Sequence, residues 1–399
     1  MMKFLKQAVL LICAITCISF GVKAQEAKAD TIYGVGVLTC SPGTEIYSAF
    51  GHSAIRVFAV VGGREVDWIY NYGTFDGFAP GFAWRFAQGK LDYFLSKSDF
   101  PSFYHDYIVE NRGMVQQELD VPYEVKQELF RLLEENYRPE NRTYRYNYFY
   151  DNCSTRVLEI IAKATGGQMK TTDASANSKT FREAIQPYLE PFPWTDFGID
   201  VALGMPCDYI IGEKQSSFLP DSVFMLIDHS TLNDKAVSME YEELLFSELE
   251  PEEEMFFTPL TTMIIWLAMM VVLTIVYMRL KKNIHILDRI TWGVSGLVGV
   301  LVLFLWFFTD HKASSWNLNL LWANPFHLFF AFASAKRILG WKWLTRISLM
   351  FLVIVIAGWS LIPQRFNDAV FPIAVALMIS YARIWWLQRK GEKEKKAVS

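Results

Sequence analysis

One cysteine and one histidine have sequence contexts that suit nucleophilic catalysis. Cys153 lies in the segment 151–156 (DNCSTR), and His52 lies roughly a hundred residues earlier in the segment 51–58 (GHSAIRVF). A cysteine thiolate can attack a carbonyl group when an imidazole takes the thiol proton and a third polar group orients the imidazole ring. The pair therefore predicts a hydrolase or an acyltransferase that works through a cysteine.

Cys153 is predicted to lie in the first turn of a helix that follows a strand. Tyrosines at alternate positions over residues 144–150 are typical of a strand, and the Asp-Asn pair before the cysteine can cap a helix. Apolar residues then recur at helical spacing until the glycine pair at 166–167 ends the helix. The N–H groups of a helix start favour a thiolate and could hold the oxyanion of acyl transfer. A small buried cysteine near a helix start is the alternative interpretation.

His52 is predicted to begin the first strand of a β-hairpin. This strand covers residues 51–58, a Gly-Gly pair at 62–63 makes the turn, and residues 65–72 return as the second strand. Opposite residues of such a pair have Cβ atoms about 5 Å apart, so Asn71 can reach the imidazole. A histidine near the start of a buried strand is more often a core residue, but its pairing with a helix-start cysteine favours a catalytic role.

Two further residues are candidates for roles in this site. Asp67 is the alternative to Asn71 as the group that orients the imidazole, and the sequence leaves this choice open. His105 lies in a predicted aromatic helix over residues 100–109 and is the reserve base. The exported histidines and cysteines do not cluster at metal-ligand spacing, so we expect neither a metal site nor a cofactor.

Residues 31–256 are expected to form one mixed α/β domain. Further strands are predicted over 32–39, 91–95 and 115–121, and further helices over 44–49, 82–86 and 123–137. The proline-rich stretch 181–225 predicts irregular structure that could form a lid over the site. Core packing is the default role of the many aromatic side chains, but four of them could line an acyl groove: Trp84, Phe86, Phe100 and Phe103.

The composition of the chain points to a membrane protein. Of its 399 residues 52% are hydrophobic, and the apolar residues gather at the two ends, while the net charge of −4 gives no indication of nucleic-acid binding. The N-terminus has the features of a secretory signal peptide: Lys3 and Lys6 precede a short apolar run over 8–20, and small residues precede a cleavage site after Ala24. An uncleaved anchor is the alternative interpretation.

The exported chain keeps three cysteines. An odd number leaves at least one thiol unpaired, and Cys153 has the activating context, so it is the expected free thiol. Cys40 and Cys207 could form a disulfide, which the sequence alone does not decide.

The part of the chain after residue 257 has the composition of a membrane domain. Five apolar stretches have about the 17–25 residues needed to cross a bilayer, and they cover residues 258–278, 290–308, 318–335, 344–361 and 369–386. Lys and Arg gather after the first, third and fifth stretches, whereas the two opposite loops carry only Lys312 and Arg365. This positive-inside pattern predicts that Cys153 lies outside the cytoplasmic membrane and the C-terminus inside the cell.

Polar residues gather around the start of the third apolar stretch. Pro325 should kink this helix near the outer leaflet, and the polar residues beside it are Asn317, Asn319, Asn324 and His327. They could bind a lipid head group below the catalytic pocket, or they could form hydrogen bonds between helices.

The segments 51–57 (GHSAIRV), 70–73 (YNYG) and 151–156 (DNCSTR) resemble those of a circularly permuted papain-like family, the NlpC/lecithin:retinol acyltransferase-like proteins, in which the His strand precedes the Cys helix. The whole chain is similar to the Lnb-type lipoprotein N-acyltransferases of Bacteroidetes, which join a periplasmic Cys–His domain to a membrane domain. The resemblance implies an α+β permuted papain-like domain followed by an all-α five-helix transmembrane bundle. It also implies that Cys153 is the nucleophile and His52 the base, and Asn71 is our candidate for the third catalytic residue.

We expect the following domain organisation from these observations together. Residues 1–24 are the signal peptide, 25–238 the periplasmic catalytic domain, 239–257 an acidic linker, 258–390 the transmembrane domain and 391–399 a basic cytoplasmic tail. The resemblance implies a multi-pass protein of the inner membrane that moves an acyl chain from a phospholipid, through a Cys thioester, to the N-terminal amine of a diacylglyceryl-cysteine lipoprotein. The alternatives are a membrane-anchored NlpC-type peptidase or amidase acting on peptidoglycan peptides, and a non-catalytic sensor or scaffold.

Overall fold

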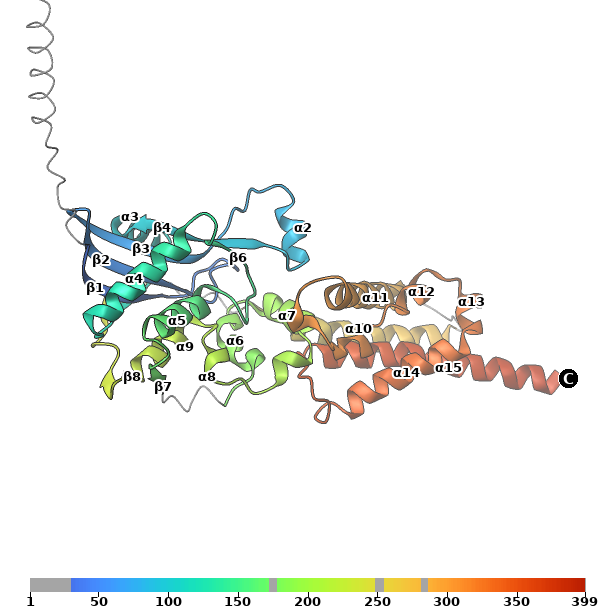
Figure 1. Cartoon of the computed structure of the whole chain (residues 1–399). Coiled ribbons are helices and arrows are strands. Elements are labelled where there is room, and N and C mark those ends of the chain that lie inside the picture. Colours follow the sequence, from blue (N-terminus) through green and yellow to red (C-terminus); the bar gives the residue numbers. More distant parts are fainter. Residues whose placement is uncertain (1–29, 172–177, 248–254, 281–285, 399) are drawn as a thin grey trace, which may run out of the picture.

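The computed structural model describes residues 30–171, 178–247, 255–280 and 286–398. The expected signal peptide and the central part of the expected acidic linker lie outside these ranges. The described chain forms two parts, an α+β N-terminal part and a helical C-terminal part. They lie end to end along the long axis of the molecule (Figure 1).

A seven-stranded antiparallel sheet forms the centre of the N-terminal part. The predicted hairpin is confirmed, because β2 and β3 pair in antiparallel register and both turn glycines, Gly62 and Gly63, have positive φ angles of 57° and 81°. The start of the expected linker is also part of the sheet, because residues 242–245 form the edge strand β10, which pairs with β5. In spatial order the strands are β10 (Glu242–Leu245), β5 (Met114–Glu118), β1 (Thr31–Cys40), β2 (His52–Val61), β3 (Arg64–Thr74), β4 (Asp92–Asp99) and β6 (Thr143–Arg145).

Helices cover both faces of this sheet. On one face, α4 (Tyr123–Tyr137) and α5 (Cys153–Ala164) bury a core with alternate residues of β1, β2 and β3. On the opposite face, α3 (Phe100–Val109) packs against the residues between them, such as Leu38 and Ile69. The sheet is therefore buried on both sides where β2 and β3 position the candidate catalytic residues.

Three local predictions in this part are wrong. Residues 44–49 form turns and not a helix. The tyrosine-rich segment is a strand only over β6, because the backbone of Asn147 bonds that of Asp151 in a turn that leads into α5. The stretch 181–225 is largely helical, since prolines lie at the first positions of α7 (Pro193–Ala202) and α9 (Pro220–Asp228), where the missing N–H costs no hydrogen bond. The other helices there are α6 (Phe181–Leu189), η2 (Met205–Asp208) and α8 (Glu213–Ser216), and a small sheet consists of β7 (Lys170–Thr171), β8 (Ser230–Leu232) and β9 (Lys235–Ala236).

Three helices of the C-terminal part are long and apolar enough to cross a membrane: α10 (Pro259–Arg279), α11 (Ile286–Phe307) and α15 (Val370–Val398), whose apolar portion ends at Gly391. The fourth predicted span is represented by the 16-residue α14 (Lys342–Ala357). The prediction of one helix over 318–335 is wrong, because Pro325 and the asparagine side chains beside it divide the segment into η4 (Leu318–Leu321) and α12 (His327–Phe332). The two remaining short helices are η3 (Lys312–Ser314) and α13 (Ala335–Gly340).

Candidate active site

The start of α5 is built by a capping box. The Asn152 side chain accepts a hydrogen bond from the Thr155 N–H at 2.9 Å, and the Thr155 hydroxyl accepts one from the Asn152 N–H at 2.8 Å. The amide nitrogen of Asn152 also donates to the carbonyls of Tyr148 and Phe218. These bonds hold Cys153 at the first position of the helix, as the sequence predicts.

An ion pair between Arg156 and Asp151 also stabilises this turn. Arg156 donates to both oxygens of Asp151 at 2.6 and 2.8 Å, and its guanidinium lies 3.7 Å from the ring centroid of Tyr144. Because the two charged residues lie on either side of Cys153 in the sequence, their pairing closes the turn around the thiol.

His52 is oriented by Asn71 across the hairpin. The imidazole Nε2 lies 2.6 Å from the Asn71 Oδ1. Asp67, the alternative candidate, instead forms a two-bond ion pair with Arg56 at 2.7 and 2.8 Å. His105 is exposed on α3, which packs against β3 and β4.

Cys153 and His52 lie side by side next to Gly73 and shift each other's pKa. Burial raises the pKa of the Cys153 thiol, but the charge and hydrogen bond of His52 and the N–H of Ser53 outweigh this effect and lower the pKa to about 7. Burial lowers the pKa of His52, but Cys153 and the hydrogen bond of Asn71 raise it, so that the net shift is upward. Both shifts favour a thiolate beside an imidazolium. Both residues are partly exposed, so a substrate can reach them.

Three residues that the sequence analysis did not single out complete this arrangement. The buried hydroxyls of Ser53 and Ser154 lie 3.0 Å apart and join β2 directly to α5. Gly73, with a φ of 90°, lies close to Cys153: a Cβ added to this glycine would be 3.3 Å from the Cys153 Cβ. The available signals were the positions of the serines, each directly after a candidate catalytic residue, and the glycine that ends YNYG.

The other two described cysteines are chemically different. Cys40 and Cys207 are free and buried, so the possible disulfide between them is not formed. Burial raises the pKa of each thiol to about 12. Cys40 lies directly opposite His52 in the β1–β2 ladder, whereas Cys207 packs in a separate core near α6. Among the residues that the structure describes, no group of three or more potential ligands is placed to hold a metal ion.

Two of the four candidate groove aromatics belong to the sheet packing. Phe103 is buried in the core under α3, and the ring of Phe100 lies 3.4 Å from the guanidinium of Arg56. Trp84 and Phe86 are exposed on α2 (Phe82–Ala87).

The polar residues near the third predicted span are buried and form hydrogen bonds within the protein. Asn317 and Asn319 donate to the carbonyls of residues 200–202 at the end of α7, which have no partners inside the helix. His327 contacts the Trp322 carbonyl at 2.8 Å and the Tyr381 hydroxyl at 2.6 Å. These contacts match the interhelical alternative, and the asparagines join the two parts of the chain.

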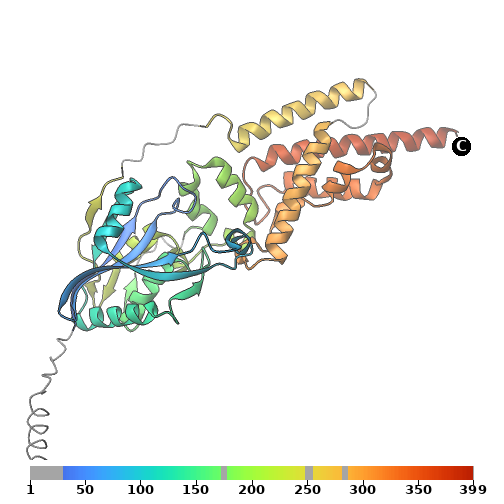
Figure 2. The same cartoon turned by 90° about the horizontal axis from the view of Figure 1, so that it is seen from above.

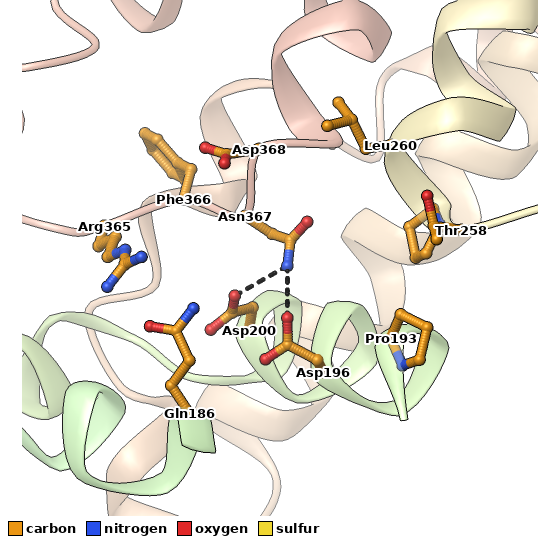
Figure 3. A pocket seen from close by; sticks show the side chains of 11 residues that line it. Gln186, Pro193, Asp196, Asp200, Thr258, Leu260, Arg365, Phe366, Asn367 and Asp368 are labelled. Atoms are coloured by element: carbon orange, nitrogen blue, oxygen red, sulfur yellow. Dashed lines mark hydrogen bonds between the residues drawn. The ribbon is translucent and has the colours of Figure 1, made fainter. Parts of the chain in front are cut away.

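A cavity of about 190 Å³ lies at the same junction (Figure 3). Asn367, just before α15, points at α7 and donates to Asp196 and Asp200, each at 3.0 Å. Burial and the neighbouring Asp200 raise the pKa of Asp196 to about 6, although Asn367 acts in the opposite direction. Asp200 is also bonded by the buried Arg182. We assign this polar cavity to the joint between the two parts.

Two family models match the chain. The model described as the Lnb N-terminal periplasmic domain matches residues 22–187, and the model described as the Lnb transmembrane domain matches residues 251–392. Neither the search of curated proteins nor the search of solved structures found a match. The first range contains all three candidate catalytic residues, and the second contains the three long apolar helices up to residue 392. The chain is therefore an Lnb-type membrane protein, with an Lnb periplasmic domain followed by an Lnb transmembrane domain.

Proposed function

We propose that this protein is a lipoprotein N-acyltransferase that moves a fatty acyl chain from a phospholipid to the N-terminal amine of diacylglyceryl-cysteine lipoproteins. The observation that carries the proposal is the pairing of Cys153 with an Asn71-oriented His52 at a helix start. A membrane domain suits a donor and an acceptor that both lie in the bilayer. A peptidase of the cell wall would need only one anchor.

The first half-reaction acylates the enzyme. The Cys153 thiolate attacks the ester carbonyl carbon of a phospholipid, and the N–H groups at the start of α5 stabilise the oxyanion. When the tetrahedral intermediate collapses, the C–O ester bond breaks and the imidazolium of His52 gives its proton to the leaving alkoxide. A lysophospholipid departs, and a thioester remains on Cys153.

The second half-reaction transfers the acyl chain. The free α-amine of a diacylglyceryl-cysteine attacks the thioester carbonyl, and His52 takes a proton from the attacking nitrogen. The C–S bond breaks, the amide forms, and the Cys153 thiolate is restored. An amine attacks a thioester in preference to water, especially in a site that excludes water at the membrane surface.

The proposed topology follows from the charge pattern of the loops. Lys and Arg gather at the ends of the apolar segments opposite the catalytic domain, which supports an inner-membrane protein with a periplasmic catalytic domain and a cytoplasmic C-terminus. The proposed boundaries are 1–24 for the signal peptide, 25–238 for the catalytic domain, 239–257 for the linker, 258–390 for the transmembrane domain and 391–399 for the tail. Within the linker, residues 242–245 belong structurally to the sheet.

The test is to trap the intermediate. Purified full-length protein in detergent is incubated with phospholipid alone, and Cys153 should gain the mass of a fatty acyl chain that hydroxylamine releases. Adding a diacylated lipopeptide with a free amine should discharge the enzyme and yield an N-acyl product. Cys153→Ser should fold and form no hydroxylamine-labile adduct, because a hydroxyl group is far less acidic than a thiol.

The same experiment separates the proposal from a thiol peptidase or amidase. Such an enzyme would be loaded by peptidoglycan peptides and would ignore phospholipid. Acylation of Cys153 by peptide and never by phospholipid would overturn the acyltransferase assignment.

A further inference from the structure

The segment of residues 74–90, called here the aromatic segment, leaves the sheet at the nucleophile. It follows Gly73, which lies against Cys153 and His52, and it returns to the sheet at β4. Between these points it carries α2 away from the sheet and beside the end of α11, as both views show (Figures 1 and 2). The segment therefore physically connects the candidate active site to a membrane helix.

The far end of the aromatic segment contacts the last turn of α11 and the residues that follow it. The ring of Trp84 lies over that of Phe304 with centroids 5.8 Å apart. The Asp310 N–H donates to the Gln88 carbonyl at 2.9 Å, and His311 Nε2 lies 3.2 Å from the Phe86 carbonyl oxygen. Phe304 lies in the last turn of the 22-residue α11, which at 1.5 Å per residue is about as long as the roughly 30 Å hydrocarbon core. Trp84 thus lies beside the end of a helix that is long and apolar enough to cross a membrane.

Large aromatic side chains of this segment face outward. Phe78 is 101% exposed, Trp84 59% and Phe86 57%. Leaving such a side chain in water forgoes about 1.5–3 kcal/mol relative to burying it. Phe307 and Phe308 at the end of α11 are exposed as well, so both segments that meet at this junction carry exposed aromatic rings. Aromatic residues are enriched at the membrane–water interface, which makes lipid the apolar medium that covers them.

A series of ring contacts runs from this surface to the nucleophile. The ring of Phe82 lies 6.3 Å from Phe86 and 5.5 Å from Phe75. Phe75 lies 5.1 Å from Tyr93, which stacks on Tyr146 at 4.1 Å. Both tyrosines lie within electrostatic range of Cys153. The rings form a continuous series of contacts between the exposed aromatic side chains of α2 and the tyrosines beside the thiol.

We propose that the aromatic segment inserts into the periplasmic leaflet of the membrane and, with the Tyr93–Tyr146 stack, guides the acyl chain of a bilayer phospholipid to Cys153. This inference rests on the proposed function for its catalytic consequence. The insertion itself does not depend on catalysis, so the two can be tested separately.

The insertion test uses photo-crosslinking in nanodiscs of phosphatidylethanolamine and phosphatidylglycerol. A benzophenone amino acid in place of Phe78 should crosslink to phospholipid in the full-length protein. The matched control places it at Phe58, which is also exposed but lies in β2 on the sheet, and which should remain unlinked. Absence of lipid adducts at position 78 overturns the inference whether or not the protein is an acyltransferase.

The transfer test uses two donors at once. Protein in nanodiscs of palmitoyl lipids also receives monomeric dihexanoylphosphatidylcholine, and the mass of the adduct on Cys153 shows which donor was used. In F78S/F86S, which keeps the Trp84–Phe304 contact, the ratio of palmitoyl to hexanoyl adducts should fall about tenfold, a change of about 1.4 kcal/mol. F58S should keep the wild-type ratio.

Each result has a defined meaning. An unchanged ratio in F78S/F86S overturns the guiding role, as does an equal loss of both adducts, since that would indicate damage to the site. If wild-type protein forms neither adduct, the proposed function fails, and the crosslinking at position 78 still decides whether the segment inserts.

Discussion

Nε2 of His52 lies 2.6 Å from Oδ1 of Asn71, across the hairpin of β2 and β3. The amide oxygen accepts a hydrogen bond, so Nε2 carries the proton and Nδ1 remains to accept the proton of the Cys153 thiol. A two-residue glycine turn sets the register that brings these side chains together. The hairpin of β2 and β3 therefore determines the tautomer of His52, because it supplies the Asn71 oxygen that accepts the Nε2 proton.

This relationship predicts the effect of removing the amide. Asn71→Ala should lower the rate of Cys153 acylation roughly 10–100-fold, because a hydrogen bond to a charged group contributes about 1.5–3 kcal/mol. Asp67→Asn should change this rate little, since Asp67 pairs with Arg56. Single-turnover acylation followed by mass spectrometry measures both rates, and the reverse order of effects would assign the orienting role to Asp67.

Substitutions of His52 and His105 should have very different effects on the rate of Cys153 acylation. His52→Ala should lose about 10²–10⁴-fold in acylation rate, the usual contribution of a positioned base. His105→Ala should be close to wild type because this side chain is exposed on α3. A large loss in His105→Ala with a small loss in His52→Ala would contradict the described site.

The pKa values predict selective alkylation of one thiol. The lowered pKa of Cys153, about 7, means that its thiolate fraction rises as the pH increases through 7, and its rate of alkylation by iodoacetamide should rise over the same range. Cys40 and Cys207, with pKa values near 12, should stay unmodified. In His52→Ala the Cys153 curve should move to higher pH, because burial remains while the stabilising imidazolium is lost. Peptide mass spectrometry across pH 5–9 gives the three curves, and an unshifted curve in the variant would contradict the pairing.

Arg182 should be important for stability rather than for chemistry. Its side chain is 3% exposed and bonds Asp200 at 2.6 Å and Asp208 at 2.9 Å. Arg182→Ala would leave two largely buried carboxylates unpaired, which should cost about 3–5 kcal/mol in the free energy of unfolding. Thermal unfolding in detergent checks this, with the exposed Arg131→Ala as the control, and equal melting temperatures for the two variants would contradict it.

Asp196 should destabilise the joint at neutral pH. Because its folded-state pKa is raised to about 6 from its ordinary 3.8, the folded protein holds the proton more tightly, and stability is lost as the pH rises between these values. Asp196→Asn keeps an acceptor for Asn367 and removes the repulsion from Asp200, so it should melt at a higher temperature than wild type at pH 7.5. The difference should shrink at pH 5, where the wild-type carboxyl is mostly protonated; a difference independent of pH would contradict the assignment.

The sequence by itself determined the features that depend on short-range rules. The capping box that places Cys153 at a helix start spans four residues, and the turn at Gly62 and Gly63 sets the hairpin register that brings His52 within reach of Asn71. Helix α4 begins and ends where the apolar period predicts, and the long apolar helices follow from composition. In each case the signal and the structure lie within one element or one turn.

Tertiary contacts decided the rest. Asn71 contacts the imidazole, whereas Asp67 lies opposite Phe58 in the β2–β3 ladder, far from His52, and pairs with Arg56. The alternating tyrosines before Cys153 look like one strand, but Tyr148 packs in the core beside α6, in the proline-rich stretch for which the sequence predicted irregular structure. Asn317 and Asn319 bind the end of α7, more than a hundred residues earlier in the chain. Partners so distant in sequence leave no periodic signal, because only the folded chain brings their donors and acceptors within reach.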